Sequence, residues 1–204
     1  MKIAISTQWN DDFKEIAAIT LPVMQEYCAR HGYTLFSNHS KEDSPKIIWQ
    51  RAEDAENLLS KYCDAVVHMD ADCLITNLNN RIEDIIELAG DADLIVTSDT
   101  DTSIMNDGVC IWLGEGGLFA CGDLAFGGKY SEYSSPQDAL NERAVPIKIV
   151  HLLPSVMNSV LNGEYGSFDP ETEWSEGDFI LHLPGIGNAR RVELLKEYST
   201  KIVR

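Results

Sequence analysis

The chain has 204 residues, of which 44% are hydrophobic and 24% charged, a composition that supports a buried core and argues against disorder. The formal net charge of −17 argues against a general nucleic-acid binder and against attachment to an anionic membrane surface, because like charges repel. Five scattered cysteines without a C-x-x-C pair favour free thiols in a reducing compartment over a structural zinc site.

Strand-like and helix-like segments alternate through the first hundred residues. We predict strands at 2–7, 33–36, 64–72 and 93–97, and helices at 11–31, 45–62 and 81–89. Such alternation is typical of a mostly parallel central sheet with helices on both faces, so the predicted fold class is α/β.

The second half of the chain is less regular. Strands are predicted at 108–113, 147–153 and 178–183, helices at 118–126, 136–143 and 189–203, a turn at 114–117 and a polar loop at 163–177. We expect one domain over residues 1–204. The sequence shows no signal peptide and no apolar run near 18 residues, so we expect no transmembrane segment and a cytoplasmic location.

An acidic pair, Asp70 and Asp72, ends a strongly apolar predicted strand. Asp-x-Asp also occurs at 91–93 and 99–101, but in polar segments where solvated or capping aspartates are common. Only Asp70 and Asp72 have apolar runs on both sides, where an unpaired carboxylate is costly. Two carboxylates at the tip of a buried strand suit a hard divalent cation, and ligands bind at that edge of an open α/β sheet. A strand-end turn without a ligand is the plainer alternative.

The acidic charge also bears on how a phosphate-containing substrate could bind. A bare acidic site would repel phosphate, and a divalent cation between carboxylates and phosphate removes that repulsion. The sequence contains no G-x-x-x-x-G-K-[ST] loop and no G-x-G-x-x-G motif. We therefore expect a bound nucleotide to be held through a metal ion rather than by a glycine loop.

Several segments together resemble a known family. Residues 67–77 (VHMDADCLITN) resemble the W-x-x-D-A-D-x-x-I-x-N stretch of the galactosyl-, mannosyl- and xylosyltransferases of the GMA12/MNN10 family. Residues 176–185 resemble its x-G-D-x-x-x-H-x-x-G segment, and shorter matches lie at 45–51, 105–111 and 136–140. These are retaining glycosyltransferases of the GT-A fold, so the resemblance implies that fold and metal-dependent sugar transfer.

The resemblance implies a metal site and a sugar pocket. Asp70 would face the ribose and the metal, Asp72 would ligate Mn²⁺ (or Mg²⁺), and His182 would complete the metal site. Asn106 and Gly108 would shape the donor-sugar pocket. Residues 1–100 would then form the nucleotide-binding half, and residues 101–204 the half that binds acceptor and completes the metal site.

The remaining implied residues concern the sugar, the acceptor and the donor. Gln137 and Asp138 would meet the sugar or acceptor and, with Asn106, form the implied catalytic set. The family's acidic residue before the glutamine is Pro136 here, and Asp138 is a candidate substitute. The implied donor-binding set adds Arg51, which stands at a family lysine position, Gly185, which closes the histidine segment, and Thr7, which ends the first strand where such folds meet uracil or guanine.

Each of these residues also has a plainer interpretation. His182 alternates with apolar residues, as a satisfied core histidine does, and residues 106–108 have the composition of a turn. Gln137 and Asp138 fit the first turn of a helix. His68 is expected to pack or to point to the opposite face of its strand. For Arg190 and Arg191, solvent exposure is the plainer expectation, and contact with a diphosphate is the alternative.

The function that best fits these features is transfer of a sugar from a nucleotide-sugar to a hydroxyl of a glycan or other acceptor. A UDP-sugar is the first expected donor and a GDP-sugar the second, with Mn²⁺ or Mg²⁺ as cofactor and retention of configuration implied by the resemblance. One alternative is a nucleotidyltransferase that makes activated sugars, although residues 6–10 lack its glycine- and lysine-rich loop. The other is an inactive module that binds carbohydrate or nucleotide.

Overall fold

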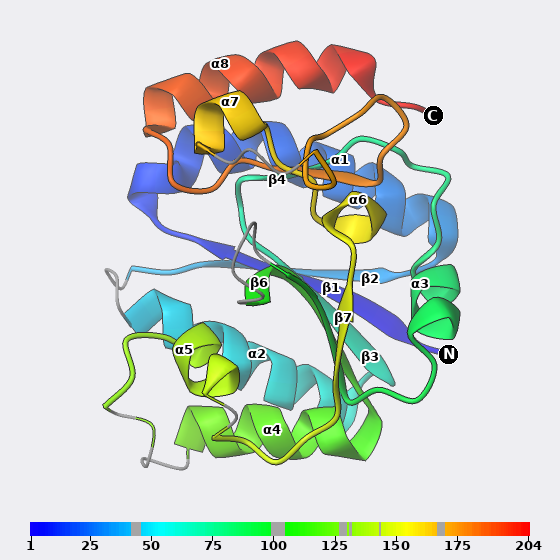
Figure 1. Ribbon diagram of the computed structural model, residues 1–204, viewed down its shortest axis with the longest axis vertical. Coiled ribbons are helices and arrows are strands. Elements are labelled where there is room, and N and C mark those ends of the chain that lie inside the picture. The colour runs from blue at the N-terminus through cyan, green and yellow to red at the C-terminus, as the bar shows by residue number, and fades with distance from the viewer. Residues whose placement is uncertain (42–45, 99–104, 127–129, 131, 143, 167–169) are drawn as a thin grey trace.

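The computed structural model describes residues 1–41, 46–98, 105–126, 130, 132–142, 144–166 and 170–204. At its centre lies a six-stranded sheet in the order β2-β1-β3-β6-β5-β7 (Figure 1). The strands are β1 Ile3–Trp9, β2 Thr34–His39, β3 Ala65–Met69, β5 Leu94–Ser98, β6 Met105–Leu113 and β7 Ile149–Leu152. All of them run parallel except β6, which is antiparallel to both of its neighbours. The predicted mostly parallel α/β sheet is therefore confirmed.

Helices cover both faces of this sheet. The longer ones are α1 Lys14–His31, α2 Lys46–Lys61, α3 Ile82–Ala89, α4 Gly114–Phe126 and α8 Asn188–Tyr198; the short ones are η1 Asp11–Phe13, α5 Pro136–Asn141, α6 Pro154–Met157, α7 Asn162–Tyr165 and η2 Ser199–Lys201. In Figure 1, α1 and α8 lie on one side of the sheet, and α2 and α4 on the other. Among the described helices, none combines the length and apolarity that a membrane crossing needs.

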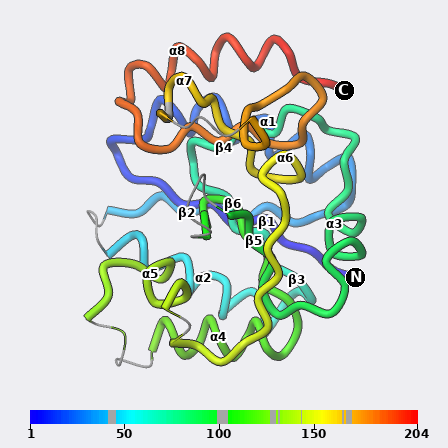
Figure 2. The backbone as a smooth tube through the Cα atoms, viewed as in Figure 1, coloured from blue at the N-terminus to red at the C-terminus, as the bar shows by residue number. Residues whose placement is uncertain are grey.

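Two separate hydrophobic cores follow from the alternation of side chains along the strands. Ile3, Ile5, Val109 and Ile111 face one core, which they share with α1, α3 and α8, whereas the intervening Ala4 and Cys110 face the other, with α2, α4 and α5. Side chains of successive strand residues point to opposite faces, so strands that are apolar throughout require cover on both sides. The chain supplies that cover by returning at its end: α8 packs against α1, which is the first long helix (Figure 2).

A second, two-stranded sheet departs from the prediction of one strand over 64–72. The central strand β3 ends at Met69, the chain turns through Asp70–Asp72, and β4 (Cys73–Ile75) then pairs antiparallel with β8 (Ile180–His182). In this pairing Cys73 lies opposite His182. The break after β3 therefore brings the acidic turn next to a histidine from the far end of the sequence.

The segment predicted as a turn at 114–117 is instead the first turn of α4. A Cβ on Gly116 would lie 1.9 Å from Oδ1 of Asp93, and one on Gly117 would lie 2.9 Å from the backbone oxygen of Asp93. These glycines thus allow the helix to approach the start of β5 closely. In the sequence, glycines that serve close packing look the same as glycines that form a turn. The strand before them, β6, begins at Met105 rather than at residue 108.

Other boundaries shift by a few residues. The predicted helix at 189–203 ends at Tyr198, followed by η2 and by a bridge between Val203 and Asn77. The predicted loop at 163–177 overlaps α7. The predicted helix start at residue 45, the pair at 99–101, the predicted helix end at residue 143 and residues 167–169 of the loop lie outside the described residues.

Candidate functional site

A cavity of about 530 Å³ opens where β1 and β3 end, β6 begins and the chain leaves β8. Its walls include eight residues singled out from the sequence: Arg51, Asp70, Asp72, Asn106, Gly108, Gln137, His182 and Gly185. They come from segments far apart in the chain, and the fold gathers them at one edge of the sheet, where ligands bind in open α/β folds. The other two implied residues, Thr7 and Asp138, are not among the described residues that line the cavity.

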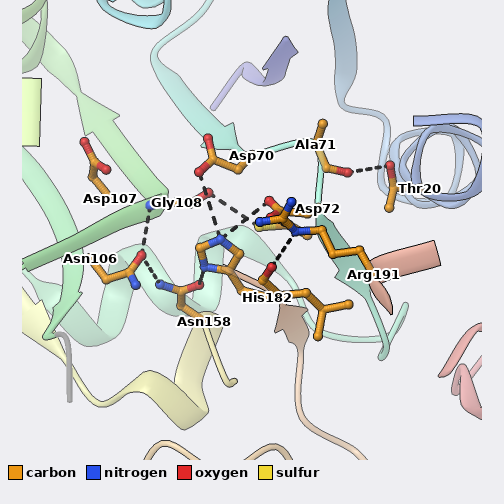
Figure 3. A network of polar contacts seen from close by, with 12 residues as sticks. Thr20, Asp70, Ala71, Asp72, Asn106, Asp107, Gly108, Asn158, His182 and Arg191 are labelled. Carbon is orange, nitrogen blue, oxygen red and sulfur yellow. Dashed lines mark hydrogen bonds and ion pairs between the residues drawn. The ribbon is translucent and has the colours of Figure 1, made fainter. Parts of the chain in front are cut away.

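The acidic turn is held from both sides. The backbone N–H of Asp70 donates to the carbonyl of Gly108 at 2.8 Å, which ties the turn to β6. The hydroxyl of Thr20 in α1 donates to the carbonyl of Ala71, also at 2.8 Å (Figure 3). The backbone of the acidic turn is thus fixed by hydrogen bonds to β6 on one side and to α1 on the other.

His182 faces both carboxylates. Its Nε2 lies 3.6 Å from Oδ1 of Asp72 and 4.0 Å from Oδ2 of Asp70 (Figure 3). The imidazole is only 3% exposed and rests on Gly108, where a Cβ would lie 2.1 Å from Cε1 of the ring. Glycine is therefore the residue that fits at position 108, and the histidine does not sit in an apolar core pocket.

The second oxygen of each carboxylate is bound by a basic side chain. Nε2 of His68 lies 3.1 Å from Oδ1 of Asp70, and Nε of Arg191 lies 2.9 Å from Oδ2 of Asp72. His68 was expected to pack or to point to the opposite face of its strand; it is buried, as the first alternative had it, and its ring also contacts Asp70. The expectation that Arg191 is solvated was wrong, because this side chain is buried against Phe13, Leu183 and Asp72.

These contacts shift the ionisation of the site. Burial alone would raise the pKa of Asp70, but the hydrogen bond from His68 and the positive charge of Arg51 hold it at about 2. Burial alone would lower the pKa of His182, and the adjacent carboxylates of Asp72 and Asp70 raise it instead. The carboxyl group of Asp70 is therefore ionised at neutral pH, and the two carboxylates favour the charged form of His182 beside them.

The donor atoms fit a divalent cation. Nε2 of His182 lies near one oxygen of Asp72 and one of Asp70, and these are ligand types that suit Mn²⁺ or Mg²⁺. Among the described residues, the group whose ligand atoms all lie within 4.8 Å of one another is Asp72, Cys73 and His182, and it does not include Asp70. Burial raises the pKa of the Cys73 thiol well above its usual value, and the S–H donates to the carbonyl of Gly108 at 3.6 Å. Cys73 is therefore the weaker ligand candidate for a hard cation.

Arg51 and Gln137 lie on the opposite wall. Arg51 forms an ion pair with Asp107 at 2.6 Å and lies 4.0 Å from Asp70. The backbone N–H of Asp107 donates to Oε1 of Gln137 at 3.2 Å. Because a backbone N–H only donates, this contact identifies the amide oxygen of Gln137, so the NH₂ group is the other end of the amide.

The end of β1 supplies further cavity residues. Gln8, Trp9 and Asn10 line the cavity, whereas Thr7 is buried just before them. The Gln8 amide nitrogen donates to the backbone oxygen of Ile47. Within the described part of the chain, Oε1 of Gln8 and Oδ1 of Asn10 are buried acceptors without a hydrogen-bond partner. An acceptor in that state is costly and is relieved by a ligand that brings an N–H or O–H donor.

Asp138 lies in the first turn of α5. Its backbone N–H donates to Oγ of Ser135, the helix N-cap, and Pro136 is the first helical residue. Asp138 therefore lies in the first turn of a helix, which was the plainer interpretation of this residue from the sequence. In the described part of 163–177, which was predicted as a polar loop, no residue lines the cavity.

Comparison with solved structures decides the fold. A glycosyltransferase involved in the glycosylation of the major capsid of PBCV-1 matches with a TM-score of 0.76 and 17% identity, covering 97% of this chain and 100% of that one. The chain has the GT-A fold. The galactosyltransferase LgtC, in complex with donor and acceptor sugar analogs, matches with a TM-score of 0.58 and 12% identity. The match covers 97% of this chain and 99% of the LgtC chain.

A third GT-A relative is longer. The glycosyltransferase GlyE of Streptococcus pneumoniae TIGR4 matches with a TM-score of 0.60 and 15% identity, covering 98% of this chain and 60% of GlyE. Neither a family model nor a curated protein matches the sequence. At identities this low, the structural matches show a shared fold and nothing more specific. The resemblance to the GMA12/MNN10 family therefore rests on the sequence motifs alone.

Proposed function

We propose that this GT-A protein transfers a sugar from a nucleotide-sugar to an acceptor hydroxyl. The observation that carries the proposal is the convergence of Asp70, Asp72 and His182 on one cavity at the ligand-binding edge of the sheet. The fold supports it, because the three solved relatives described above are glycosyltransferases.

The three converging side chains would hold Mn²⁺ or Mg²⁺. When bound, the cation would neutralise charge on the diphosphate and stabilise the departing nucleoside diphosphate. The chain's own residues prepare the site by keeping one oxygen of each carboxylate occupied, by His68 and by Arg191. The other oxygen of each carboxylate is thereby left facing His182, which favours single-oxygen ligation from each aspartate.

The nucleoside would bind at the end of β1. Trp9 offers an aromatic face, and the unpartnered oxygens of Gln8 and Asn10 would accept hydrogen bonds from ring N–H or sugar O–H groups. Thr7, the residue implied by the sequence, is one position further into the strand. A UDP-sugar remains the first proposed donor and a GDP-sugar the second.

Retention of configuration is implied by the motif resemblance, and the contacts of Asp107 and Gln137 bear on how it would be achieved. An enzyme-bound nucleophile would need a free carboxylate or amide oxygen near the anomeric carbon. Asp107 is paired with Arg51, and the oxygen of Gln137 accepts from the Asp107 N–H. Front-face attack needs no such group: the acceptor O–H bonds to the anomeric carbon, the bond to phosphate breaks, and the leaving phosphate oxygen takes the proton. The NH₂ of Gln137 would then orient the sugar or acceptor by donating to a hydroxyl.

Thermal stability tests the donor site. We expect UDP to raise the melting temperature only when Mn²⁺ is present, and Asp72→Asn to abolish this shift. Asp91→Asn is the matched control, because Asp91 belongs to another Asp-x-Asp pair and its side chain is 97% exposed. A shift that does not need the metal, or one that survives in Asp72→Asn, would contradict the proposed site. A larger shift with GDP than with UDP would favour a GDP-sugar as the donor.

Donor hydrolysis separates an enzyme from an inert module. Slow release of UDP from UDP-sugars in the presence of Mn²⁺ is expected for the wild type and not for Asp72→Asn. Nucleotide binding without any hydrolysis or transfer would favour the binding module, and release of pyrophosphate from a nucleoside triphosphate and a sugar phosphate would favour nucleotidyl transfer.

A further inference from the structure

Asn158 is a buried polar residue that sequence patterns did not single out. It follows α6, is 2% exposed and is not among the described residues that line the cavity. Its neighbour Ser159 is joined to β8 by two backbone hydrogen bonds, from Ser159 N–H to Ile180 and from His182 N–H to Ser159, of 3.1 and 2.8 Å. The backbones of Asn158 and His182 are thus held in register.

A chain of hydrogen bonds assigns the orientation of two amide side chains. The backbone N–H of Gly108 lies 3.0 Å from the side chain of Asn106, and because this N–H only donates, the atom facing it is the oxygen Oδ1. The side chain of Asn158 lies 3.0 Å from that same oxygen and 2.9 Å from Oγ1 of Thr97. The atom of Asn158 that approaches Asn106 must therefore be its nitrogen.

The oxygen of Asn158 then points at His182. It lies 3.0 Å from Nδ1 of the imidazole (Figure 3). An amide oxygen only accepts, so Nδ1 of His182 must carry a hydrogen, and in the neutral ring Nε2 is the unprotonated nitrogen. Nε2 is the atom that faces Asp70 and Asp72.

We propose that Asn158 is a positioning residue that fixes His182 in the Nδ1–H tautomer and so keeps the lone pair of Nε2 directed at the carboxylates. Asn106 acts through it: both hydrogen bonds to its oxygen come from within the protein, which makes this cavity residue a member of the network. The consequence for metal binding rests on the proposed function, whereas the tautomer itself does not.

Nitrogen-15 NMR of the imidazole rings tests the assignment on the metal-free protein, at a pH where the ring is neutral. The signal of His182 is identified by its loss in His182→Gln. We expect the Nδ1–H tautomer in the wild type. In Asn158→Leu, which has a similar volume but no acceptor, we expect Nε2–H, because the acceptors that the described residues then place beside the ring are the carboxylates of Asp70 and Asp72. Asn158→Asp restores an acceptor and should restore Nδ1–H.

Thr97→Val is the matched control. It removes the other partner of the Asn158 nitrogen but leaves the contact with His182, so the tautomer should not change. Free Mn²⁺, followed by electron paramagnetic resonance, gives a second measurement that is independent of activity. We expect about 10–100-fold weaker Mn²⁺ binding in Asn158→Leu.

The outcomes separate the inference from the proposed function. An Nε2–H tautomer in the wild type overturns the inference, and so does Asn158→Leu with unchanged tautomer and Mn²⁺ affinity. A wild type with Nδ1–H that binds no Mn²⁺ supports the inference and contradicts the proposed metal site. If Asn158→Leu does not fold, the wild type and Asn158→Asp decide the tautomer.

Discussion

At the scale of single residues, the site depends on the missing side chain of Gly108. The imidazole of His182 occupies the volume that a Cβ would take. The N–H of the same glycine donates to the side-chain oxygen of Asn106, and its carbonyl accepts from the N–H of Asp70. One backbone unit thus positions the histidine, the acidic turn and the amide network together. Such a position tolerates no side chain, although its backbone is not in the left-handed region.

Gly108→Ala is expected to displace His182. The new methyl would lie 2.1 Å from Cε1, so the ring must move away from the carboxylates, and overpacking should cost about 1–3 kcal/mol of folding free energy. Mn²⁺ binding, measured by isothermal titration calorimetry, should weaken about tenfold or more. Gly122→Ala is the control, because its methyl would meet only Cγ of Glu56 at 3.7 Å and it lies in α4. Equal metal affinities in the two variants would contradict this account.

Sequence patterns found the residues whose chemistry is visible in isolation. An acidic pair between apolar runs, a histidine within a Gly-Asp to Pro-Gly segment and a glycine after Asn-Asp all line the cavity. Asn158 was missed and Arg191 was expected to be exposed, because asparagines and arginines occur widely on protein surfaces and the tertiary fold brings these two to His182 and Asp72. Nothing in the sequence shows that Arg190 and Arg191 differ in burial.

At the scale of elements, the hydrophobic pattern predicted where strands occur more accurately than where they begin and end. The run over 64–75 is apolar almost throughout, and its two carboxylates were placed at the end of one strand, whereas they form the turn between β3 and β4. The pattern cannot show that β4 leaves the central sheet, because its partner β8 is contributed from more than a hundred residues away in the sequence. The pattern likewise does not show that β6 runs antiparallel to its neighbours β3 and β5.

The start of α3 shows how a distant side chain stabilises an element. The hydroxyl of Tyr33, just before β2, accepts from the backbone N–H of Ile82 at 3.3 Å and donates to the carboxylate of Glu83. Glu83 also lies 3.3 Å from Arg81. Burial alone would raise the pKa of Glu83, but the hydrogen bond from Tyr33 and the charge of Arg81 lower it.

This contact predicts a dependence of stability on pH. A carboxyl whose pKa is lowered by folding stabilises the protein above its unfolded pKa, near 4.5, and that contribution is lost as the pH falls through the folded pKa. Tyr33→Phe should lose about 1 kcal/mol at neutral pH and fall less steeply in stability between about pH 5 and about pH 3. Urea unfolding at each pH measures this, with Tyr62→Phe, at an exposed tyrosine, as control. Parallel curves for Tyr33→Phe and the wild type would contradict it.

At the scale of the whole molecule, the two cores explain why fold class was predictable. Strands without a polar face require helices on both sides, and the alternation of strands and helices supplies them. The pattern does not show which helix closes the site. In the structure it is α8, which packs on α1 and directs Arg191 at the acidic turn.

Arg191 places a fixed positive charge inside an acidic molecule of net charge −17. Its guanidinium and the carboxylate of Asp72 are both about nine-tenths buried, so each depends on the other for compensation. The ion pair joins the C-terminal helix to the turn after β3, and folding of the chain end is thereby coupled to the charge state of the candidate metal site.

Arg191→Met should leave Asp72 buried without its counter-charge. We expect a loss of about 3 kcal/mol in the metal-free protein, or roughly 10 °C in melting temperature. Arg190→Met is the control: this neighbouring residue pairs with Glu164 and Glu193 at the surface, where ion pairs contribute little, so its loss should leave the melting temperature nearly unchanged. Mn²⁺ should raise the melting temperature of Arg191→Met more than that of the wild type, because the cation then supplies positive charge to the Asp72 carboxylate that the arginine no longer compensates. Calorimetric scans with and without Mn²⁺ measure both effects, and an equal response of the two arginine variants would show that the buried ion pair does not couple α8 to the site.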